Sequence, residues 1–165
     1  MRRALPSVAP DTSQLVIFVL DEQRYALCLD IVDRVVRAVE VTPLPEAPSI
    51  ILGIINLQGR VVPVVNLRRR FHLEERAVDI DDHFVIARSS TGLVALPVDE
   101  AQGLVKDMRG DCVPAAEIVQ DLNYVDQVFL YGSEMVFVLD IDTVLSDDEE
   151  LALADSLSSV DAVRD

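Results

Sequence analysis

The sequence is poor in cysteine and in long apolar runs. Its two cysteines, Cys28 and Cys112, are too few for a disulfide framework, and neither has a neighbouring Cys or His that would complete a metal site. We interpret both as thiols in a reducing compartment. The longest apolar stretch, 50–57, is interrupted by Gly53 and Asn56 and is much shorter than the ~20 residues of a membrane span.

The amino terminus lacks the apolar segment of a signal peptide. Arg2 and Arg3 resemble the charged start of such a peptide, but Pro6 and Pro10 follow in place of an apolar run. We therefore predict a flexible tail over residues 1–13 and a cytoplasmic protein.

Positive charge is scarce, and the formal net charge of the chain is -15. This charge repels phosphate backbones and anionic bilayers, so we expect neither nucleic acid binding nor direct membrane insertion. The charge is also uneven: Arg60 and 68–70 cluster in the middle, and 147–150 form an acidic run. These clusters are either solvated surface or two distinct docking faces.

Recognisable catalytic motifs are absent too. There is no G-x-S-x-G nucleophile motif and no glycine-rich phosphate-binding loop. His72 and His83 have no carboxylate or thiol at metal-ligand spacing, and we interpret them as solvated surface residues. We predict no enzymatic activity, no metal and no cofactor.

One segment keeps an enzyme alternative open. Asp140 and Asp142 follow an apolar strand in MVFVLDIDTVL, which resembles the first motif of the haloacid-dehalogenase phosphatases. Two carboxylates at strand spacing point the same way and can share a magnesium ion. That motif opens its domain in the phosphatases, however, whereas only residues 144–165 follow it here. The other interpretation is two solvated acids before a helix N-terminus.

The apolar pattern of the first half predicts β-strands. LVIFVLDEQRYALCL is typical of a hairpin that turns at 21–24, and a strand over 33–41 follows and ends in a proline-rich segment. Two further strands meet at Gln58 and Gly59, a pair suited to a tight turn. Pro63 lies inside the second of them, so we expect an edge strand or a bulge there.

The second half predicts more strands and one helix. We expect strands over 84–88, 92–98, 100–105, 125–131 and 134–139, the last two forming a hairpin around Gly132. Ser146 is expected to cap a helix that has acids in its first turn. Residues 107–123 are typical of a loop with a short helix.

Similar β units recur after roughly 70 residues, and one unit of about five short strands has the size of a small SH3-like barrel. We therefore predict a mainly β fold of two five-stranded SH3-like barrel lobes within one domain, 14–157. A short C-terminal α-helix would pack across one lobe, and 158–165 would form a tail. Chance similarity between valine-rich strands is the alternative to a repeat.

A longer stretch connects the sequence to a known family. LGIINLQGRVVPVVNLRRRF resembles the signature of the CheW proteins, in which Asn-Leu-Arg-Gly, an apolar-Pro pair and Asp-Leu-Arg recur. IVDRVVRAVEVTPLPEAP, GLVALPVDEAQGLV and VFVLDIDTVLSDDEELAL resemble further segments of the family in the same order. The resemblance extends over residues 14–157.

The resemblance implies two five-stranded SH3-like barrels and a function without a reaction. CheW proteins couple the cytoplasmic tips of methyl-accepting chemoreceptors to the regulatory domain of the CheA histidine kinase. We therefore expect a non-enzymatic chemosensory adaptor that is recruited to membrane receptor arrays through its partners. A CheW-like module of a non-chemotactic signalling complex is the second interpretation.

The resemblance also implies a receptor-binding groove on the third strand, the Asn-Leu-Arg-Gly turn and one further strand. An apolar trough with few polar anchors suits a helical receptor tip. The kinase would contact other strands of the first barrel. The groove residues are Val32, Arg34, Val36, Gly53, Asn56, Gln58, Gly59 and Ala101.

Arg34 and Gln58 depart from the family pattern, because familiar members pair a glutamate and an arginine at these positions. An exposed ion pair contributes only ~0–1 kcal/mol, so the fold should tolerate its loss. The groove gains positive charge instead. We hypothesise a receptor tip with a complementary acid, in an alternative chemosensory pathway rather than flagellar taxis.

Overall fold

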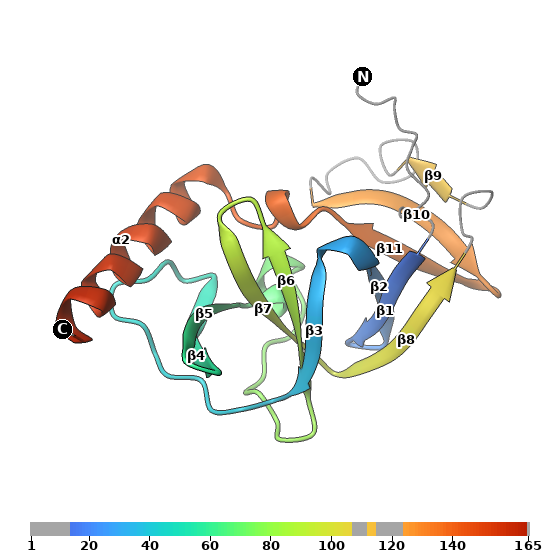
Figure 1. The fold of residues 1–165 in the computed structure, drawn as a ribbon. Coiled ribbons are helices and arrows are strands. Elements are labelled where there is room, and N and C mark those ends of the chain that lie inside the picture. The colour runs from blue at the N-terminus through green and yellow to red at the C-terminus, as the bar shows by residue number, and fades with distance from the viewer. Residues whose placement is uncertain (1–13, 107–111, 115–123, 165) are drawn as a thin grey trace.

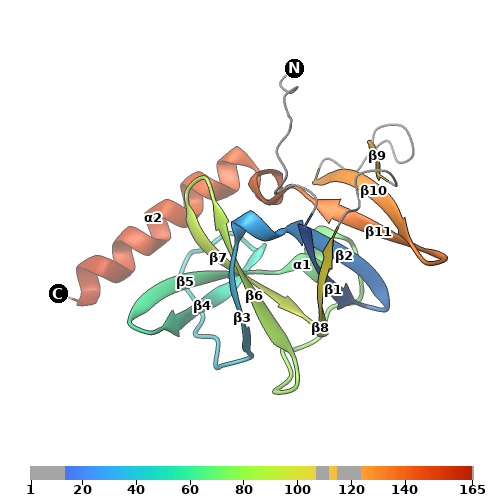
Figure 2. The same ribbon diagram turned by 45° about the vertical axis from the view of Figure 1, so that its right-hand side comes forward.

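Short β-strands make up most of the described chain, as the apolar pattern predicts. The computed structural model describes residues 14–106, 112–114 and 124–164. Their strands form two sheets, and one long helix lies beside the sheet that contains β5 and β7 (Figures 1 and 2). Within these ranges no helix is long and apolar enough to cross a membrane.

One sheet takes its strands from both ends of the described chain, and we call it the terminal lobe. Its six strands lie in the order β8-β1-β2-β11-β10-β9. Neighbouring strands are antiparallel except β2 and β11, which pair in parallel. The strands are β1 (Gln14–Leu20), β2 (Gln23–Cys28), β8 (Glu100–Lys106), β9 (Cys112–Pro114), β10 (Val125–Tyr131) and β11 (Glu134–Leu139).

The other sheet comes from the middle of the chain, and we call it the middle lobe. Its five strands lie in the order β3-β6-β7-β5-β4. A bridge between Thr42, which follows β3, and Ile54 of β4 joins the two ends of this sheet, so the sheet curls into a barrel. The strands are β3 (Val32–Arg37), β4 (Ile51–Leu57), β5 (Arg60–Val65), β6 (His83–Ser89) and β7 (Gly92–Val98), and α1 (Leu67–Arg70) follows β5.

The predicted mainly β fold of two small lobes is confirmed, but the lobes are not consecutive halves of the chain. The N-terminal hairpin belongs with the C-terminal strands, because Arg24, Tyr25 and Ala26 of β2 pair in parallel with residues of β11. The terminal lobe also has six strands rather than five, since β9 adds to β10. The idea of two units in chain order was therefore wrong.

The predicted hairpins are confirmed where local turn chemistry specifies them. Asp21 and Glu22 join β1 to β2 with φ angles of 54° and 69°. Both residues adopt the positive φ of the tight turns that match strand twist. The expected third strand is shorter than predicted, because β3 ends at Arg37. The tail over 1–13 lies outside the described residues, as does most of the loop over 107–123.

Pro63 is neither on an edge strand nor at a bulge, so that prediction was wrong. β5 lies between β4 and β7 in the sheet. The bulge of the β4–β5 pair lies on β4, between Ile51 and Gly53. Ile54, the partner of Pro63, directs both its N–H and its C=O to Thr42. Ile54 and Pro63 therefore form a non-hydrogen-bonded pair, in which the missing proline N–H removes no bond to β4.

Apolar side chains form one core in each lobe and a third core between them. The terminal lobe encloses Leu15, Ile17, Ala26, Phe129, Val136 and Val138. The middle lobe encloses Ile55, Val62, Val64, Phe84, Ile86 and Ala95. The shared core includes Phe18 and Leu27 from one sheet and Val85 and Leu96 from the other. Alternate residues of β1 and β6 thus face different cores, which joins the lobes into one unit.

A chain of ion pairs also connects the lobes at Asp99, between β7 and β8. The Asp99 carboxylate accepts hydrogen bonds from Arg68 and Arg76, both at 2.6 Å, and from the Asp21 backbone N–H at 2.8 Å. Arg76 also pairs with the buried Asp82. Burial acts to raise the pKa of Asp99, but the Asp21 N–H and the two arginines outweigh it, and the pKa is lowered.

Ser146 caps helix α2 (Asp147–Arg164), as predicted. The Glu149 N–H donates to Ser146 Oγ at 3.2 Å, and the Ser146 N–H donates to Glu149 Oε1 at 2.8 Å, which is a capping box. Arg70 pairs with the same Glu149, so one member of the arginine cluster contacts the acidic run. The helix continues beyond 157, where we expected the tail to begin.

We predict that Asp99→Asn lowers the free energy of unfolding at neutral pH by about 1–3 kcal/mol, because two arginines lose their shared charged acceptor. The pKa of Asp99 is lowered by folding, so its contribution is present above the unfolded pKa of about 4 and is lost as pH falls through the folded value. The difference between Asp99→Asn and the original protein should therefore shrink at acid pH.

Urea denaturation from neutral pH to about pH 3 tests this expectation across the relevant carboxylate range. Glu75→Gln is the matched control, because it removes an exposed carboxylate from Arg69 and should have the smaller effect on the free energy of unfolding. Equal losses for the two variants would contradict a special role of Asp99.

Candidate functional site

The structure brings β3 and the β4–β5 turn together, as expected for the groove. Arg34 Nη1 donates to Gln58 Oε1 at 3.2 Å, so a neutral hydrogen-bond acceptor replaces the expected ion pair. Gln58 and Gly59 turn with φ angles of 54° and 90°. Asn56 stabilises the turn, because its Oδ1 accepts from the Gly59 N–H at 2.7 Å.

A bulge at Asp33 organises the charges on β3. Val32 pairs with Ala87 and Arg34 pairs with Ile86, so Asp33 is the extra residue between them. Its carboxylate contacts Arg34 at 2.7 Å and Arg88 at 3.2 Å. The expected gain of positive charge at Arg34 is therefore partly offset by Asp33 and reinforced by Arg88.

The same bulge separates two of the expected groove residues. Val32 and Val36 have even spacing, which would place them on one face of a regular strand. Val32 instead packs against the core between the lobes, and Val36 packs against the core of the middle lobe. Both are half-buried. The apolar trough expected along β3 is thus divided between its two faces.

Gly53 is buried rather than exposed in a groove. A Cβ atom at this position would lie 2.3 Å from the carbonyl oxygen of Thr42 and 2.8 Å from Cγ1 of Val41. The glycine allows β4 to approach the Val41–Thr42 backbone at the bridge that closes the middle lobe. Its local role is to support the neighbouring surface.

Ala101 belongs to the other lobe, where it lies opposite Phe18 in the β8–β1 pair and is half-buried. Strand β6, the neighbour of β3, also packs against β8. A groove that included both Ala101 and Arg34 would therefore cross the boundary between the lobes.

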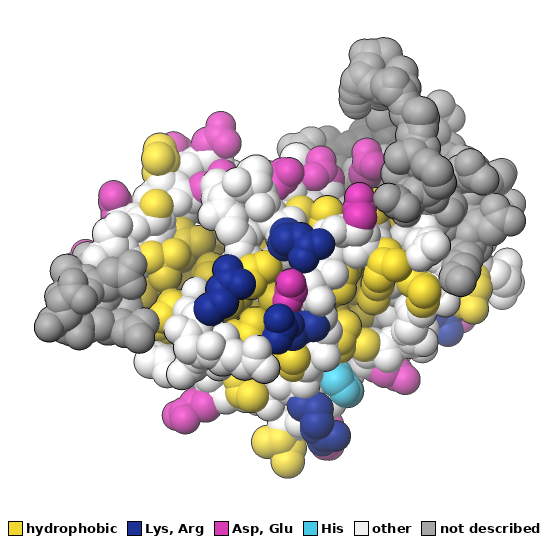
Figure 3. Space-filling model, viewed as in Figure 1, with side chains coloured by type: hydrophobic (Ala, Val, Ile, Leu, Met, Phe, Trp, Pro, Cys, Tyr) yellow, Lys and Arg dark blue, Asp and Glu magenta, His cyan; other side chains and the backbone are white. Residues whose placement is uncertain are grey.

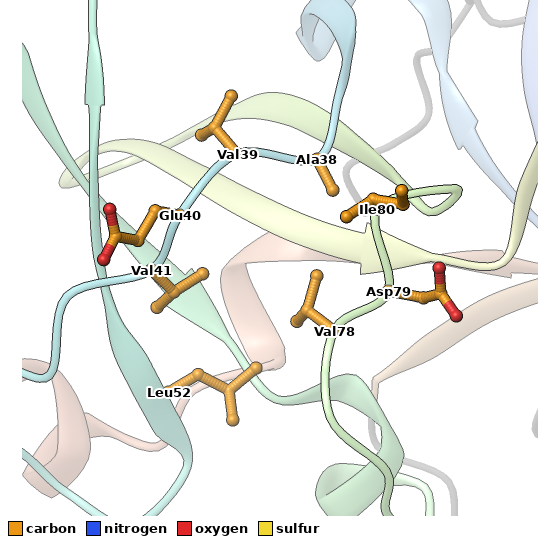
Figure 4. Close-up of a pocket in the computed structure, with 8 residues that line it drawn as sticks. All are labelled: Ala38, Val39, Glu40, Val41, Leu52, Val78, Asp79 and Ile80. Carbon is orange, nitrogen blue, oxygen red and sulfur yellow. The ribbon is translucent and has the colours of Figure 1, made fainter.

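A second surface, which the sequence did not predict, is a hollow of about 510 Å³ beside the end of β3. Figure 4 shows Val41, Leu52, Val78 and Ile80 extending toward one another, while the carboxylates of two lining acids point away. Val39, Leu52 and Ile80 are exposed, the last by 80%. The full lining is Ala38, Val39, Glu40, Val41, Leu52, Val78, Asp79 and Ile80.

Asp140 and Asp142 do not form the carboxylate pair of the phosphatase alternative. Strand β11 ends at Leu139, so the strand spacing on which that idea depended is absent. Asp140 Oδ1 accepts from the Asp142 N–H at 3.1 Å, whereas Asp142 Oδ1 accepts from the Ser90 N–H at 2.7 Å. Desolvation raises the pKa of Asp140. No cluster of metal-ligating side chains occurs in the part of the chain that the structure describes.

Comparison with known proteins gives this arrangement its context. Residues 14–149 match the family model described as CheW-like domain. The chain belongs to the CheW-like domain family. The CheW fold expected from the signature around the Gln58–Gly59 turn is thereby confirmed.

Proteins of this family from distant bacteria are similar over most of their length. A chemotaxis protein CheW of Treponema pallidum is 29% identical over 159 residues, which cover 93% of this chain and 94% of the relative. A CheW of Klebsiella aerogenes is 28% identical and covers 88% of both chains. The crystal structure of the scaffolding protein TtCheW from Thermoanaerobacter tengcongensis superposes with a TM-score of 0.76 at 26% identity, and covers 84% of this chain and 95% of that one.

We predict that Gly53→Ala lowers the free energy of unfolding by at least about 2 kcal/mol, because the new methyl group would overlap the Thr42 carbonyl. Gly59→Ala is the control. Its Cβ would meet no atom within 4 Å, so only the positive φ opposes it, at about 1 kcal/mol. Chemical denaturation of both variants checks the order, and a more stable Gly53→Ala would contradict the close approach.

Proposed function

We propose that this chain is a non-enzymatic chemosensory adaptor that couples methyl-accepting chemoreceptors to a CheA-type histidine kinase in the cytoplasm. The observation that carries this proposal is the CheW-like match over residues 14–149. The names of its relatives, chemotaxis proteins and a scaffolding protein, support the same role. A CheW-like module of a non-chemotactic complex remains a less favoured form of the same binding function.

The receptor would bind where β3 meets the β4–β5 turn. Arg34 and Gln58 meet there across the mouth of the middle lobe, and the half-buried Val36 lies on the same strand. A helical tip needs apolar contacts flanked by polar groups that fix its register. On this surface Val36 supplies an apolar contact, and Arg34 and Gln58 supply the polar groups.

The kinase regulatory domain would bind the apolar hollow on the same lobe. The hollow is lined by the segment after β3, by Leu52 of β4 and by the loop before β6, which all belong to the middle lobe. The apolar side chains of Val39, Leu52 and Ile80 are exposed in the free protein. On binding they would form the buried apolar centre that protein interfaces require.

The two proposed surfaces lie toward opposite ends of β3. Arg34 lies near the start of β3, and Val39 follows its end. At about 3.3 Å per residue, these positions are roughly 15 Å apart along the strand. An adaptor needs such separate faces, because it must hold receptor and kinase simultaneously.

We predict that Ile80→Asp weakens binding to the kinase regulatory domain at least roughly tenfold and leaves receptor binding unchanged, because a charge replaces an apolar side chain that lines the hollow. Ile80 is 80% exposed, so the substitution should not disturb folding. Leu151→Asp on α2 is the matched control, since Leu151 is 68% exposed and lies outside the hollow. Isothermal titration with each partner measures both affinities.

Equal kinase affinities for Ile80→Asp and Leu151→Asp would exclude the hollow as the kinase contact. The adaptor function itself is tested by pull-down from lysate of the source cells with the original protein. Recovery of both a chemoreceptor and a histidine kinase is the expected result, and recovery of neither would overturn the proposed function.

A further inference from the structure

Nine of the described arginines fall into three groups according to their ion pairs. Five of them pair with carboxylates of the adaptor itself: Arg24 with Glu134, Arg68 with Asp99, Arg69 with Glu75, Arg70 with Glu149 and Arg76 with Asp82. Arg34 and Arg88 share one carboxylate, that of Asp33. For Arg37 and Arg60, no ion pair occurs with any described side chain. Positive charge that is not balanced by a neighbouring carboxylate is therefore confined to Arg34, Arg88, Arg37 and Arg60 among these arginines.

Most of this surplus gathers on one face of the middle lobe. Arg34 and Arg88 contact opposite oxygens of Asp33, at 2.7 and 3.2 Å, and their side chains are 42% and 52% exposed. Arg60 follows the turn whose Gln58 accepts a hydrogen bond from Arg34. It also lines a cleft with Leu93, the cross-strand neighbour of Arg88. We call Arg34, Arg60, Arg88, Asp33 and Gln58 the arginine face.

Figure 3 shows basic side chains around a single acidic one on the side of the molecule where β3 lies, with hydrophobic atoms exposed beside them. Three guanidinium groups and one carboxylate leave a local charge of about +2, on a chain whose net charge is -15. Each guanidinium keeps N–H groups that its contacts in the protein do not use, because arginine has five donors. The positive charge and the unused N–H donors of the arginine face therefore suit the binding of an anion.

We propose that the arginine face binds carboxylates on the helical tip of the chemoreceptor, which makes it a specificity determinant of the adaptor. This inference depends on the proposed function. Arginine forks match carboxylates in two-point contacts, and the apolar atoms nearby suit the body of a helix. Phosphate would also fit a guanidinium, but the strong negative charge of the whole chain opposes nucleic acid and anionic lipid.

The test compares Arg34→Glu and Arg88→Glu with Arg37→Glu. All three substitutions make the same change in charge, and Arg37 lies on β3 too, but opposite His83 and on the other face from Arg34. Each protein is titrated with the soluble cytoplasmic hairpin of a chemoreceptor from the same organism. We expect roughly tenfold or greater loss of affinity for Arg34→Glu and Arg88→Glu, and less than about twofold for Arg37→Glu.

Three further measurements accompany this comparison. The affinity of the original protein should fall more steeply with salt than that of Arg34→Glu, since its contacts are ionic. A receptor hairpin with lysine in place of a tip glutamate should bind Arg34→Glu better than the original hairpin does. Arg34→Gln, which removes the charge without reversing it, should lose affinity as well, and it replaces Arg34→Glu if thermal melting shows that the reversed variant is unfolded.

The outcomes separate this proposal from the adaptor function. If the original protein binds no receptor hairpin, the proposed function fails. If it binds and Arg34→Glu behaves like Arg37→Glu, the arginine face is overturned while the adaptor function stands. Phosphatidylglycerol vesicles that retain the original protein but not Arg34→Glu would show a lipid surface as the ligand and would overturn the protein partner.

Discussion

The parallel pairing of β2 with β11 is the constraint on which the rest of the structure depends. It joins the N-terminal hairpin to the last strands, so the middle lobe is an insertion, in chain order, between strands of one sheet. Phe18 and Leu27 of that sheet then pack against Val85 and Leu96 of the middle lobe. Because the shared core and the Asp99 ion pairs connect the lobes, surfaces on the middle lobe keep a fixed relation to the terminal lobe.

Features specified by neighbouring residues could be predicted from the sequence. The turns at Asp21–Glu22 and Gln58–Gly59 and the Ser146 capping box depend on residues within a few positions of one another. The β2–β11 pairing and the Thr42–Ile54 bridge depend on segments far apart along the chain, and a single sequence has no pattern for them. The two predicted lobes were therefore correct in kind and wrong in how the chain is shared between them.

The candidate site also combines features that the sequence predicts with features that it does not. The family resemblance placed Arg34 near Gln58, and their side chains do meet. No glycine or proline lies at the Asp33 bulge, so the sequence contains no residue that would predict it. The bulge places Val32 and Val36 on different faces of β3. Gly53 was assigned to the groove because it belongs to the signature, whereas its backbone is needed where Thr42 passes at close range. A signature thus combines residues that form a surface with residues that support it.

Charge patterns in the sequence and on the surface also differ for a physical reason. Arg68, Arg69 and Arg70 are consecutive and look like a basic patch, yet each has a carboxylate partner within the protein. Arg34 and Arg88 are distant in sequence, and only the β3–β6 pairing brings them to one acid. A guanidinium group that has a carboxylate of its own contributes little further attraction for a partner, whereas Arg34 and Arg88 share one carboxylate and so keep an excess of positive charge. In an acidic protein, this excess positive charge shows which part of the surface an acidic partner can approach.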